Sequence, residues 1–350
     1  MNILSIGSFP QERNNTTCHR SDCLREHASY FQELDNTPKM TLWWKIIYHL
    51  GYYGLRFNIP DTQDVNKRII EEIRKHQYDI IWIDKGFNIL PKTLKIIKKV
   101  QPHCILVHYM IDDFMNPYHK TKQILDTIPL YDYYIVNRKA NVGELKAYGC
   151  KNPICTFMSY EPKFHHPYPL EEEDKVRLGG DVGFIGTYEK DRAESIKFLA
   201  NNGITVRVWG GGWEQLKDCS PNLIIEGKGL YTVDFCKAIQ CFKINLGFLR
   251  KKSRDYHTTR TFEIPGCGGF LLAERTDEHL ALFEEDKEAA FFSSNEELLE
   301  KCRYYLSHED ERNAIALAGH KRCESSGYSN EEVIKQLLKM IIKKNKRKLD

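Results

Sequence analysis

The stretch from residue 255 to residue 278 limits the possible folds of this chain more than any other, and it reads DYHTTRTFEIPGCGGFLLAERTDE. We expect a short helix from about Thr261 that stops after Cys267, because the glycines there accept the left-handed backbone that ends helices. The apolar run at 270–273 then predicts a strand buried on both faces, as in a parallel sheet. A helix that turns directly into a buried parallel strand indicates an α/β fold.

Strand-like and helix-like runs alternate through the rest of the chain, which is typical of parallel sheets with crossover helices. The opening strand, glycine loop and helix predict a Rossmann-like domain, although the full G-x-G-x-x-G pattern is missing. Strands are predicted at 2–6, 79–84, 104–109, 133–137, 181–186, 204–209, 242–248 and 289–292. Helices are predicted at 20–34, 41–57, 64–76, from Pro91, at 139–148 and 295–306, with two more reaching about 344.

The length of 350 residues exceeds one ordinary α/β core and predicts two domains. We expect an N-terminal Rossmann-like domain at 1–163, joined by 330–350, and a C-terminal Rossmann-like domain at 179–329. The linker at 164–178 contains most of a proline-rich segment, 161–170, and the acidic run 171–174, and we expect no regular element there. His165 and His166 are interpreted as solvated linker residues.

Composition and charge exclude several classes of protein. Hydrophobic residues make up 41% of the chain and the net charge is only +3, which argues against disorder and against a dedicated nucleic-acid binder. We find no secretory leader and no apolar run of membrane-spanning length. The eleven cysteines lack metal-ligand spacing, so we expect reduced thiols in a cytoplasmic protein and no metal. The basic C-terminus is either a solvated tail or a weak contact with an anionic membrane surface.

The aromatic segment at 41–57 has two possible interpretations. It packs against the sheet, or it forms a wall for an acceptor. Its aromatic residues are Trp43, Trp44, Tyr48, Tyr52, Tyr53 and Phe57.

The residues around the start of the helix in the 255–278 stretch suit a nucleotide. Thr258, Thr259 and Arg260 precede or begin the helix, where backbone N–H groups and a guanidinium attract phosphate. Glu263, one turn further, could accept hydrogen bonds from ribose hydroxyls. The stretch therefore predicts a cradle for a nucleotide diphosphate, and the alternative is an ordinary helix–glycine–strand corner with a solvated arginine.

The run RTFEIPGCGGFLLAE and its continuation to about residue 328 resemble the C-terminal half of the CgeB-like glycosyltransferases, which are related to the large retaining GT-B group. The resemblance covers about 180–328 well and the N-terminal half loosely. It implies a GT-B fold: two Rossmann-like domains facing a cleft, with the last helix crossing back to the N-terminal domain. The N-terminal domain would bind the acceptor and the C-terminal domain the nucleotide sugar. In the group's Glu-x7-Glu motif, the second Glu holds the donor ribose and corresponds to Glu263, followed by Gly268. The first Glu corresponds to Asp255, which is a departure.

The same resemblance implies further roles. Gly186, Thr187 and Arg192 would bind the donor diphosphate with Thr259 and Arg260, and Gly229, Leu230 and Tyr231 would border the nucleobase. The donor would be a UDP-sugar rather than a GDP-sugar, with no other cofactor, and the acceptor a glycan, a protein or a small molecule. Without an Asp-x-Asp motif in the C-terminal domain, Arg192 and Arg260 would stabilise the leaving diphosphate and the reaction would be metal-independent.

The resemblance favours a retaining reaction, which needs no strong base. An inverting enzyme would need one, and the candidates are His19, His108, Asp112 and Asp113; we also count Asp255 among the candidate catalytic residues. Two other functions remain open: a non-catalytic sugar-binding or structural protein, and a nucleotide-sugar epimerase of the same fold.

Overall fold

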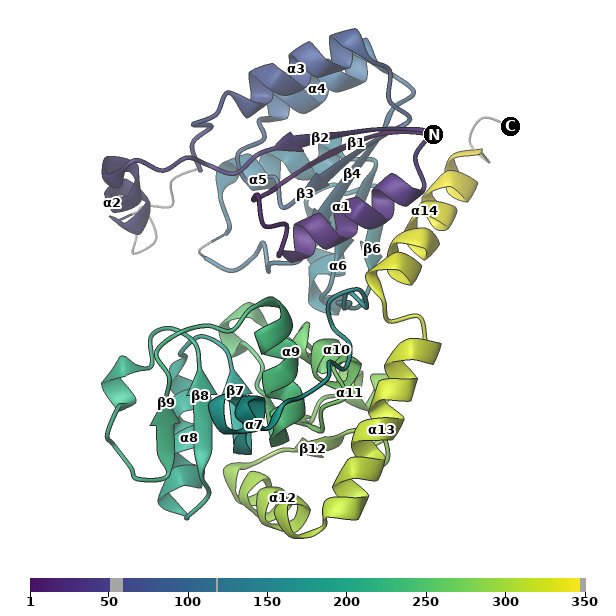
Figure 1. Ribbon diagram of the computed structural model, residues 1–350. Coiled ribbons are helices and arrows are strands. Elements are labelled where there is room, and N and C mark those ends of the chain that lie inside the picture. Colours follow the sequence, from purple (N-terminus) through teal and green to yellow (C-terminus); the bar gives the residue numbers. More distant parts are fainter. Residues whose placement is uncertain (51–58, 118, 347–350) are drawn as a thin grey trace. The chain divides into compact units, whose positions relative to one another are not determined.

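The computed structural model describes residues 1–50, 59–117 and 119–346 (Figure 1). The chain forms two compact units. The first comprises Met1–Phe157, Lys251–Arg254 and Glu331–Asp350, and the second comprises Met158–Arg250 and Asp255–Asn330. The segment that we expected to be a linker, 164–178, thus lies within the second unit.

The first unit is built on a parallel sheet of six strands in the order β2-β1-β3-β4-β5-β6. Both neighbours of β1 run parallel to it, and the strand order reverses between β1 and β3. Ligands of open α/β sheets bind at such a reversal, beyond the carboxyl ends of the strands. The strands are β1 (Asn2–Gly7), β2 (Tyr30–Asp35), β3 (Ile80–Asp84), β4 (Ile105–Met110), β5 (Tyr133–Val136) and β6 (Pro153–Cys155).

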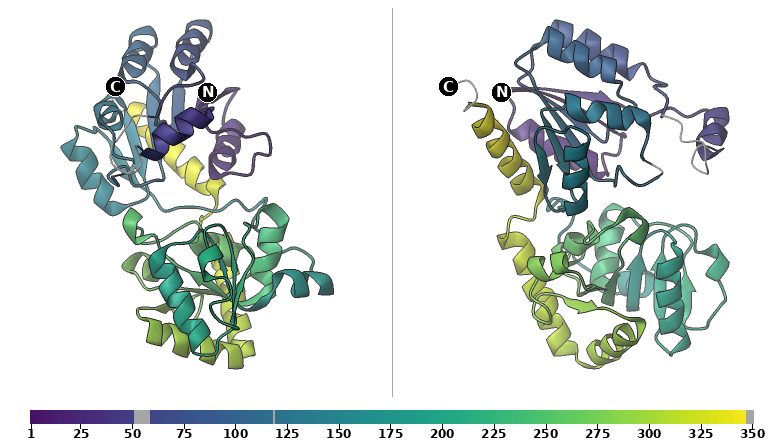
Figure 2. Two further views of the ribbon diagram at one scale, coloured as in Figure 1. Left: turned by 90° about the vertical axis from the view of Figure 1, so that its left-hand side faces the viewer. Right: turned by 180° about the vertical axis from the view of Figure 1, so that it is seen from behind.

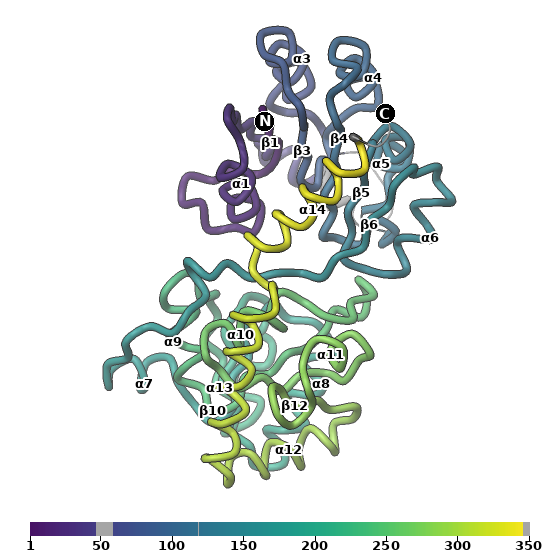
Figure 3. The backbone as a smooth tube through the Cα atoms, turned by 90° about the vertical axis from the view of Figure 1, so that its right-hand side faces the viewer, coloured from purple at the N-terminus to yellow at the C-terminus, as the bar shows by residue number. Residues whose placement is uncertain are grey.

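Helices cover both faces of this sheet because its central strands are apolar on both sides. On one face, Ile81 and Ile83 pack with residues of α3 and α4, which lie side by side in Figure 2. On the other face, Ile80 and Trp82 pack with α1 and with α14, which crosses the strands in Figure 3. The helices are α1 (Thr16–Glu26), α2 (Leu42–Leu50), α3 (Val65–Lys75), α4 (Pro91–Val100), α5 (Lys122–Thr127), α6 (Lys139–Ala147) and α14 (Asn330–Lys346).

The second unit holds another parallel sheet of six strands, in the order β12-β11-β10-β7-β8-β9. Counted within this unit, the order is 6-5-4-1-2-3, the Rossmann arrangement, and the reversal lies between β7 and β10. The strands are β7 (Gly180–Ile185), β8 (Val206–Trp209), β9 (Leu223–Ile225), β10 (Phe242–Gly247), β11 (Leu271–Glu274) and β12 (Ala290–Phe292).

The core of the second unit lies between this sheet and the helices on one face. Val182, Ile244 and Leu272 of the sheet pack with residues of α8 and α12. The remaining helices include α10, which turns into β11 as predicted. The helices are α7 (Glu172–Leu178), α8 (Lys190–Asn201), α9 (Thr232–Cys241), α10 (Arg260–Gly266), α11 (Asp277–Leu282), α12 (Asn295–Ser307) and α13 (Glu309–Ser325). The architecture is the GT-B fold of two Rossmann-like units, and its last helix returns to the first unit.

Two predictions of local structure are wrong. The helix expected at 20–34 ends at Glu26, and Tyr30–Asp35 is a strand at the edge of the first sheet, held to β1 by backbone hydrogen bonds. The expected linker at 164–178 was predicted to be irregular, but its acidic run starts α7. There Glu171 and Asp174 each bind a backbone N–H of the other residue, forming a capping box.

The aromatic helix expected at 41–57 is observed from Leu42 to Leu50, and residues 51–58 lie outside the described part of the chain. Trp43 is 69% exposed, so this residue does not pack against the sheet. Within the described residues, no helix has the length and apolar character needed to cross a membrane.

Candidate functional site

The carboxyl edge of the second sheet, at the reversal between β7 and β10, carries the residues that the sequence singled out. A narrow pocket of about 10 Å³ lies there, with space for a single water molecule. Strands β7 and β10 form its floor, and α9 and α10 form its sides. Its lining residues are Gly183, Ile185, Phe235, Ile239, Asn245, Leu246, Arg260 and Ile264.

A chain of hydrogen bonds holds the first turn of α10. The Thr261 hydroxyl accepts the backbone N–H of Thr258 and lies 2.9 Å from Nε2 of His279. The Nδ1 of His279 lies 2.6 Å from the carbonyl of Glu274, so Nδ1–H donates there and Nε2 accepts from Thr261. Burial lowers the pKa of His279 to about 4, which keeps the ring neutral and this arrangement intact.

The segment before α10 is held by a second histidine. His257 is buried, its Nδ1 lies 2.6 Å from Glu278, and its Nε2 accepts the backbone N–H of Met158 at 2.8 Å. Since Nε2 accepts this hydrogen bond, Nδ1 carries the proton and donates to the Glu278 carboxylate. The two histidines therefore place Arg260 by holding the backbone on either side of it.

Arg260 and Glu263 form an ion pair on one face of α10, one turn apart. The guanidinium of Arg260 also donates from Nε to the Ile185 carbonyl at 3.3 Å and lies 4.3 Å from the centre of the Phe235 ring. Burial alone would raise the pKa of Glu263, but the charges of Arg260 and His165 outweigh it and lower this pKa below its ordinary value. Glu263 is thus a buried, ionised acceptor, and its partner Arg260 is one-third exposed.

His165 is not the solvated linker residue that we expected. Its ring is largely buried, its Nδ1 accepts the N–H of Glu161, and its Nε2 lies 3.8 Å from the Glu263 carboxylate. Burial lowers the pKa of His165 against the opposing effect of Glu263. The three prolines around this residue indicated only irregular structure, and nothing in the local sequence pointed to α10.

Arg192 reaches the same sheet edge from α8. It is buried, it donates to the Thr187 carbonyl at 3.2 Å, and its guanidinium lies 5.6 Å from the centre of the Phe184 ring. Burial lowers its pKa, while nearby carboxylates, including that of Asp255, act in the opposite direction. Its Nε is buried and has no hydrogen-bond partner among the residues that the structure describes.

The loops after β7, β8 and β9 lie against one another. The N–H of Gly186 donates to the Trp209 carbonyl, and the N–H of Gly210 donates to the Lys228 carbonyl, both at 2.8 Å. Gly210 has a φ of +146°, and a Cβ there would lie 2.0 Å from the Gly186 oxygen, so only glycine fits. Next to Lys228 are the three residues predicted to border the nucleobase, Gly229, Leu230 and Tyr231; Leu230 is buried, and Tyr231 is 69% exposed.

The other residues of the predicted cradle are at the two ends of α10. Thr259 precedes Arg260, and its side chain helps to lower the pKa of Glu263. Gly268 lies beyond the C-terminal end, where its φ of +81° ends the helix. Gly268 thus supplies the left-handed backbone conformation that follows the helix. Because α10 has only seven residues, the positive charge at its start comes mainly from the Arg260 guanidinium.

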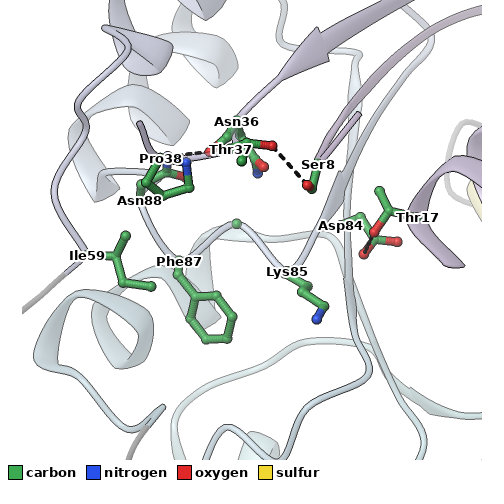
Figure 4. A pocket seen from close by; sticks show the side chains of 11 residues that line it. Ser8, Thr17, Asn36, Thr37, Pro38, Ile59, Asp84, Lys85, Phe87 and Asn88 are labelled. Atoms are coloured by element: carbon green, nitrogen blue, oxygen red, sulfur yellow. Dashed lines mark hydrogen bonds between the residues drawn. The ribbon is translucent and has the colours of Figure 1, made fainter. Parts of the chain in front are cut away.

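In the first unit, a pocket of about 120 Å³ lies at the reversal between β1 and β3 (Figure 4). In the view of Figure 4, Ser8 and Thr37 lie above the opening and Lys85 and Phe87 lie below it. Lys85 has a φ of +62°, a costly conformation for a residue other than glycine, and such strain concentrates at functional sites. The lining residues are Ser8, Thr17, Asn36, Thr37, Pro38, Ile59, Asp84, Lys85, Gly86, Phe87 and Asn88.

A buried ion pair lies beside this pocket. Arg20 donates to both oxygens of Asp84, at 2.7 and 3.0 Å, and Thr17 donates to the same carboxylate. The guanidinium lies 4.5 Å from the centre of the Tyr109 ring. Both charged side chains are 5% exposed or less, although Asp84 also lines the pocket.

The candidate bases are in the first unit, and most are engaged. Asp113 is buried and accepts two hydrogen bonds at 2.6 Å from Arg254, which lower its pKa against the effect of burial. Asp112 pairs with Lys85 at 3.0 Å, which likewise lowers its pKa against burial. His108 lies between tyrosine rings and 2.7 Å from the Lys85 carbonyl, and burial lowers its pKa to about 4. His19 is buried in α1.

Sequence reasoning missed several residues that shape these sites: His257, Thr261 and His279 around α10, and Asp84 and Lys85 in the first unit. The signal for the last two was available, because an Asp–Lys–Gly run directly follows a buried strand. The histidines carried no local signal, since their partners come from other elements. No cluster of three or more His, Cys, Asp or Glu side chains that could hold a metal occurs among the described residues.

Residues 192–339 match a family model described as glycosyl transferase-like, a region that contains α10 and all its partners except those before residue 192. The chain matches no curated protein sequence.

Solved structures share the fold over the whole chain. HepE from Anabaena, in complex with UDP, is 12% identical with a TM-score of 0.64, over 98% of this chain and 100% of that one. Sucrose-phosphate synthase from Thermosynechococcus elongatus is 10% identical with a TM-score of 0.65, over 98% and 99%. The N-terminal domain of trehalose-6-phosphate phosphatase from Candida albicans is 10% identical with a TM-score of 0.69, over 97% and 96%.

Proposed function

We propose that this chain is a glycosyltransferase, of the CgeB-like type, that transfers a sugar such as a hexose from a UDP-sugar to an acceptor. The observation that carries the proposal is the Arg260–Glu263 pair on α10, at the reversal point of a Rossmann sheet. The match of residues 192–339 to a glycosyl transferase-like family supports it. So does the fold that the chain shares with HepE, which has been solved with UDP and with UDP-glucose.

In this proposal, Glu263 accepts hydrogen bonds from the ribose hydroxyls. It is suited to this role because it is buried and ionised, and a charged acceptor forms the stronger hydrogen bond. Arg260 leaves its ion pair with Glu263 and binds the donor diphosphate instead. This exchange is possible because the Arg260 side chain is partly exposed. The loop at Gly229, Leu230 and Tyr231 then meets the base, and the exposed Tyr231 ring offers a surface for stacking.

In this proposal, Arg260 and Arg192, rather than a metal ion, stabilise the negative charge that develops on the leaving diphosphate. The buried Nε–H of Arg192, which lacks a protein acceptor among the described residues, is a ready donor. Fixed cations in a site of low dielectric stabilise a growing charge without reorganising.

We further propose retention of configuration and a cytoplasmic location. A retaining transfer needs no general base, and Asp113 and His108 are buried and already bonded to other groups. All eleven cysteines are free, the state that the reducing cytoplasm maintains. The acceptor would bind in the pocket of the first unit, between polar side chains and the Phe87 ring.

The test is a thermal-shift screen against UDP-, GDP-, CMP- and dTDP-sugars, followed by product analysis. A donor at one hundred times its Kd adds about 2.7 kcal/mol to the free energy of unfolding. We expect a UDP-sugar to give the largest shift and to be slowly hydrolysed without acceptor. Binding without any hydrolysis would favour a sugar-binding protein, and conversion of one UDP-sugar into another would favour an epimerase.

A further inference from the structure

Helix α2 presents an apolar surface that its own unit does not cover. Leu42, Trp43, Trp44 and Ile46 are 77, 69, 39 and 45% exposed. Figures 1 and 2 show this helix standing away from the other helices of the first unit. Other large exposed apolar residues, such as Val176 and Leu317, are scattered singly, which is ordinary for a protein surface. In α2, by contrast, four such residues fall within five consecutive positions, and we call this exposed apolar cluster the patch.

The charge around this patch indicates what covers it. The sequence between Asp35 and Asp61 contains no acidic residue, and the described residues near the patch include Lys39 and Lys45. Lys39 and Lys45 are exposed, the second within the patch itself. Two copies of such a basic surface would repel each other, whereas an anionic surface would attract it. Tryptophan combined with lysine on a short helix is typical of segments that lie in the headgroup layer of a membrane.

We propose that α2 docks on an anionic lipid surface, with Trp43 and Trp44 among the headgroups and Lys45 next to the lipid phosphates. The docking site is separate from the donor site on α10. It adjoins the pocket of the first unit, because Pro38, before α2, and Ile59, after it in the sequence, both line that pocket. If the pocket binds the acceptor, which rests on the proposed function, the acceptor would be one carried by a membrane.

The test is co-sedimentation of the full chain with vesicles of phosphatidylcholine alone or mixed with phosphatidylglycerol. We expect binding to the mixed vesicles and a blue shift of the tryptophan emission. The double variant Trp43→Ser/Trp44→Ser should bind at least about tenfold more weakly, because two exposed rings lose their apolar contact. Lys45→Glu should weaken binding to mixed vesicles only.

Two control variants distinguish binding through α2 from binding through another part of the chain. Val176→Ser/Leu317→Ser removes two exposed apolar residues elsewhere and should bind as the unchanged protein does. Lys343→Glu/Lys344→Glu tests the basic end of α14, and loss of binding in this variant alone would overturn the assignment to α2. Unchanged vesicle binding by the tryptophan variant would also overturn the assignment. So would a different pattern: no protein binds vesicles, the unchanged protein is a dimer, and the tryptophan variant is a monomer.

The thermal shift with UDP-glucose distinguishes this inference from the proposed function. The tryptophan variant should show the same shift as the unchanged protein, since α2 is not part of the donor site. If no variant responds to a nucleotide sugar but vesicle binding behaves as expected, the proposed function fails and the lipid-docking site stands.

Discussion

Each of the two sheets carries an arginine–carboxylate pair near its reversal point, but the two pairs differ in exposure. In the first unit, Arg20 and Asp84 are 5 and 3% exposed, and the guanidinium is bonded to both carboxylate oxygens. In the second unit, Glu263 is equally buried, but Arg260 is 32% exposed. The guanidinium of the closed pair is inaccessible and suited to hold structure in place, whereas that of the open pair is accessible to a ligand. Exposure of the cation, and not the presence of a pair, therefore distinguishes the candidate donor site.

Removing the cation of the closed pair should have the largest effect. Arg20→Ala leaves Asp84 buried without its counter-charge, which costs about 3–5 kcal/mol of unfolding free energy. Denaturation in guanidinium chloride measures this, with Arg177→Ala as control: the Arg177 guanidinium is nearly half exposed, so loss of its pairs with Asp234 and Asp174 should cost much less. Equal effects of the two substitutions would contradict the distinction between closed and open pairs.

Removing the cation of the open pair should affect the reaction more than the fold. If Arg260 acts as proposed, Arg260→Ala should lower kcat by roughly two to three orders of magnitude, because its guanidinium would stabilise the charge that grows as the sugar bond breaks. The KM for the donor should rise much less, and Arg260→Lys should restore only part of kcat because lysine lacks the bidentate fork.

The matched control for this substitution is Arg322→Ala. Arg322 also donates from Nε to a backbone carbonyl, lies over an aromatic ring and faces a carboxylate, Glu288, but it belongs to α13. The substitution Arg322→Ala should leave kcat unchanged. A variant Arg260→Ala with normal kcat and a raised KM would make Arg260 a docking residue only.

Each unit also contains a buried neutral histidine, and both should make the fold sensitive to acid. The pKa values of His108 and His279 are lowered by burial from 6.5 to about 4. The unfolded chain takes up these protons first, so stability is complete above pH 6.5 and falls as the pH drops toward 4, by about 3 kcal/mol for each histidine at most. Unfolding free energies at pH 7 and pH 5 should differ less in His108→Gln and in His279→Gln than in the unchanged protein; an unchanged difference would show that these rings are not the sensitive groups.

The carboxylate of the open pair should matter for the donor. Glu263→Gln should weaken donor binding by about 1.5–3 kcal/mol, because a charged hydrogen bond to the ribose becomes a neutral one. Titration calorimetry measures this, and Glu288→Gln serves as the control because Glu288 faces an arginine outside the pocket. An unchanged donor affinity would remove Glu263 from the ribose role.

Removal of metal ions by a chelator should have the smallest effect on the rate of sugar transfer. In the proposed function, Arg260 and Arg192 stabilise the leaving diphosphate without a metal ion. Sugar transfer should therefore continue at the same rate in excess EDTA. Loss of transfer that manganese or magnesium restores would show that these cations do not suffice.

The strand and helix pattern of both units could be predicted from the sequence because it depends on local composition. Buried parallel strands such as β3, β5 and β11 are largely apolar runs, and the glycines after α10 force its end. The edge strand β2 was mistaken for helix because its pattern, YFQELD, carries few apolar residues and its identity depends on hydrogen bonds to β1. The helix α7 was missed for a different reason, since prolines outweighed its capping box.

The sequence alone determined the α/β class and the part of the site that lies within one short stretch, Arg260 and Glu263, because two residues three positions apart on a helix must share a face. Only the tertiary structure decided what surrounds them. His165 comes from about one hundred residues earlier in the chain, and the Ile185 carbonyl and the Phe235 ring come from two other elements. The structure also decided that Arg20 is closed and Arg260 open, because exposure depends on packing between elements distant in the chain, which no local pattern records.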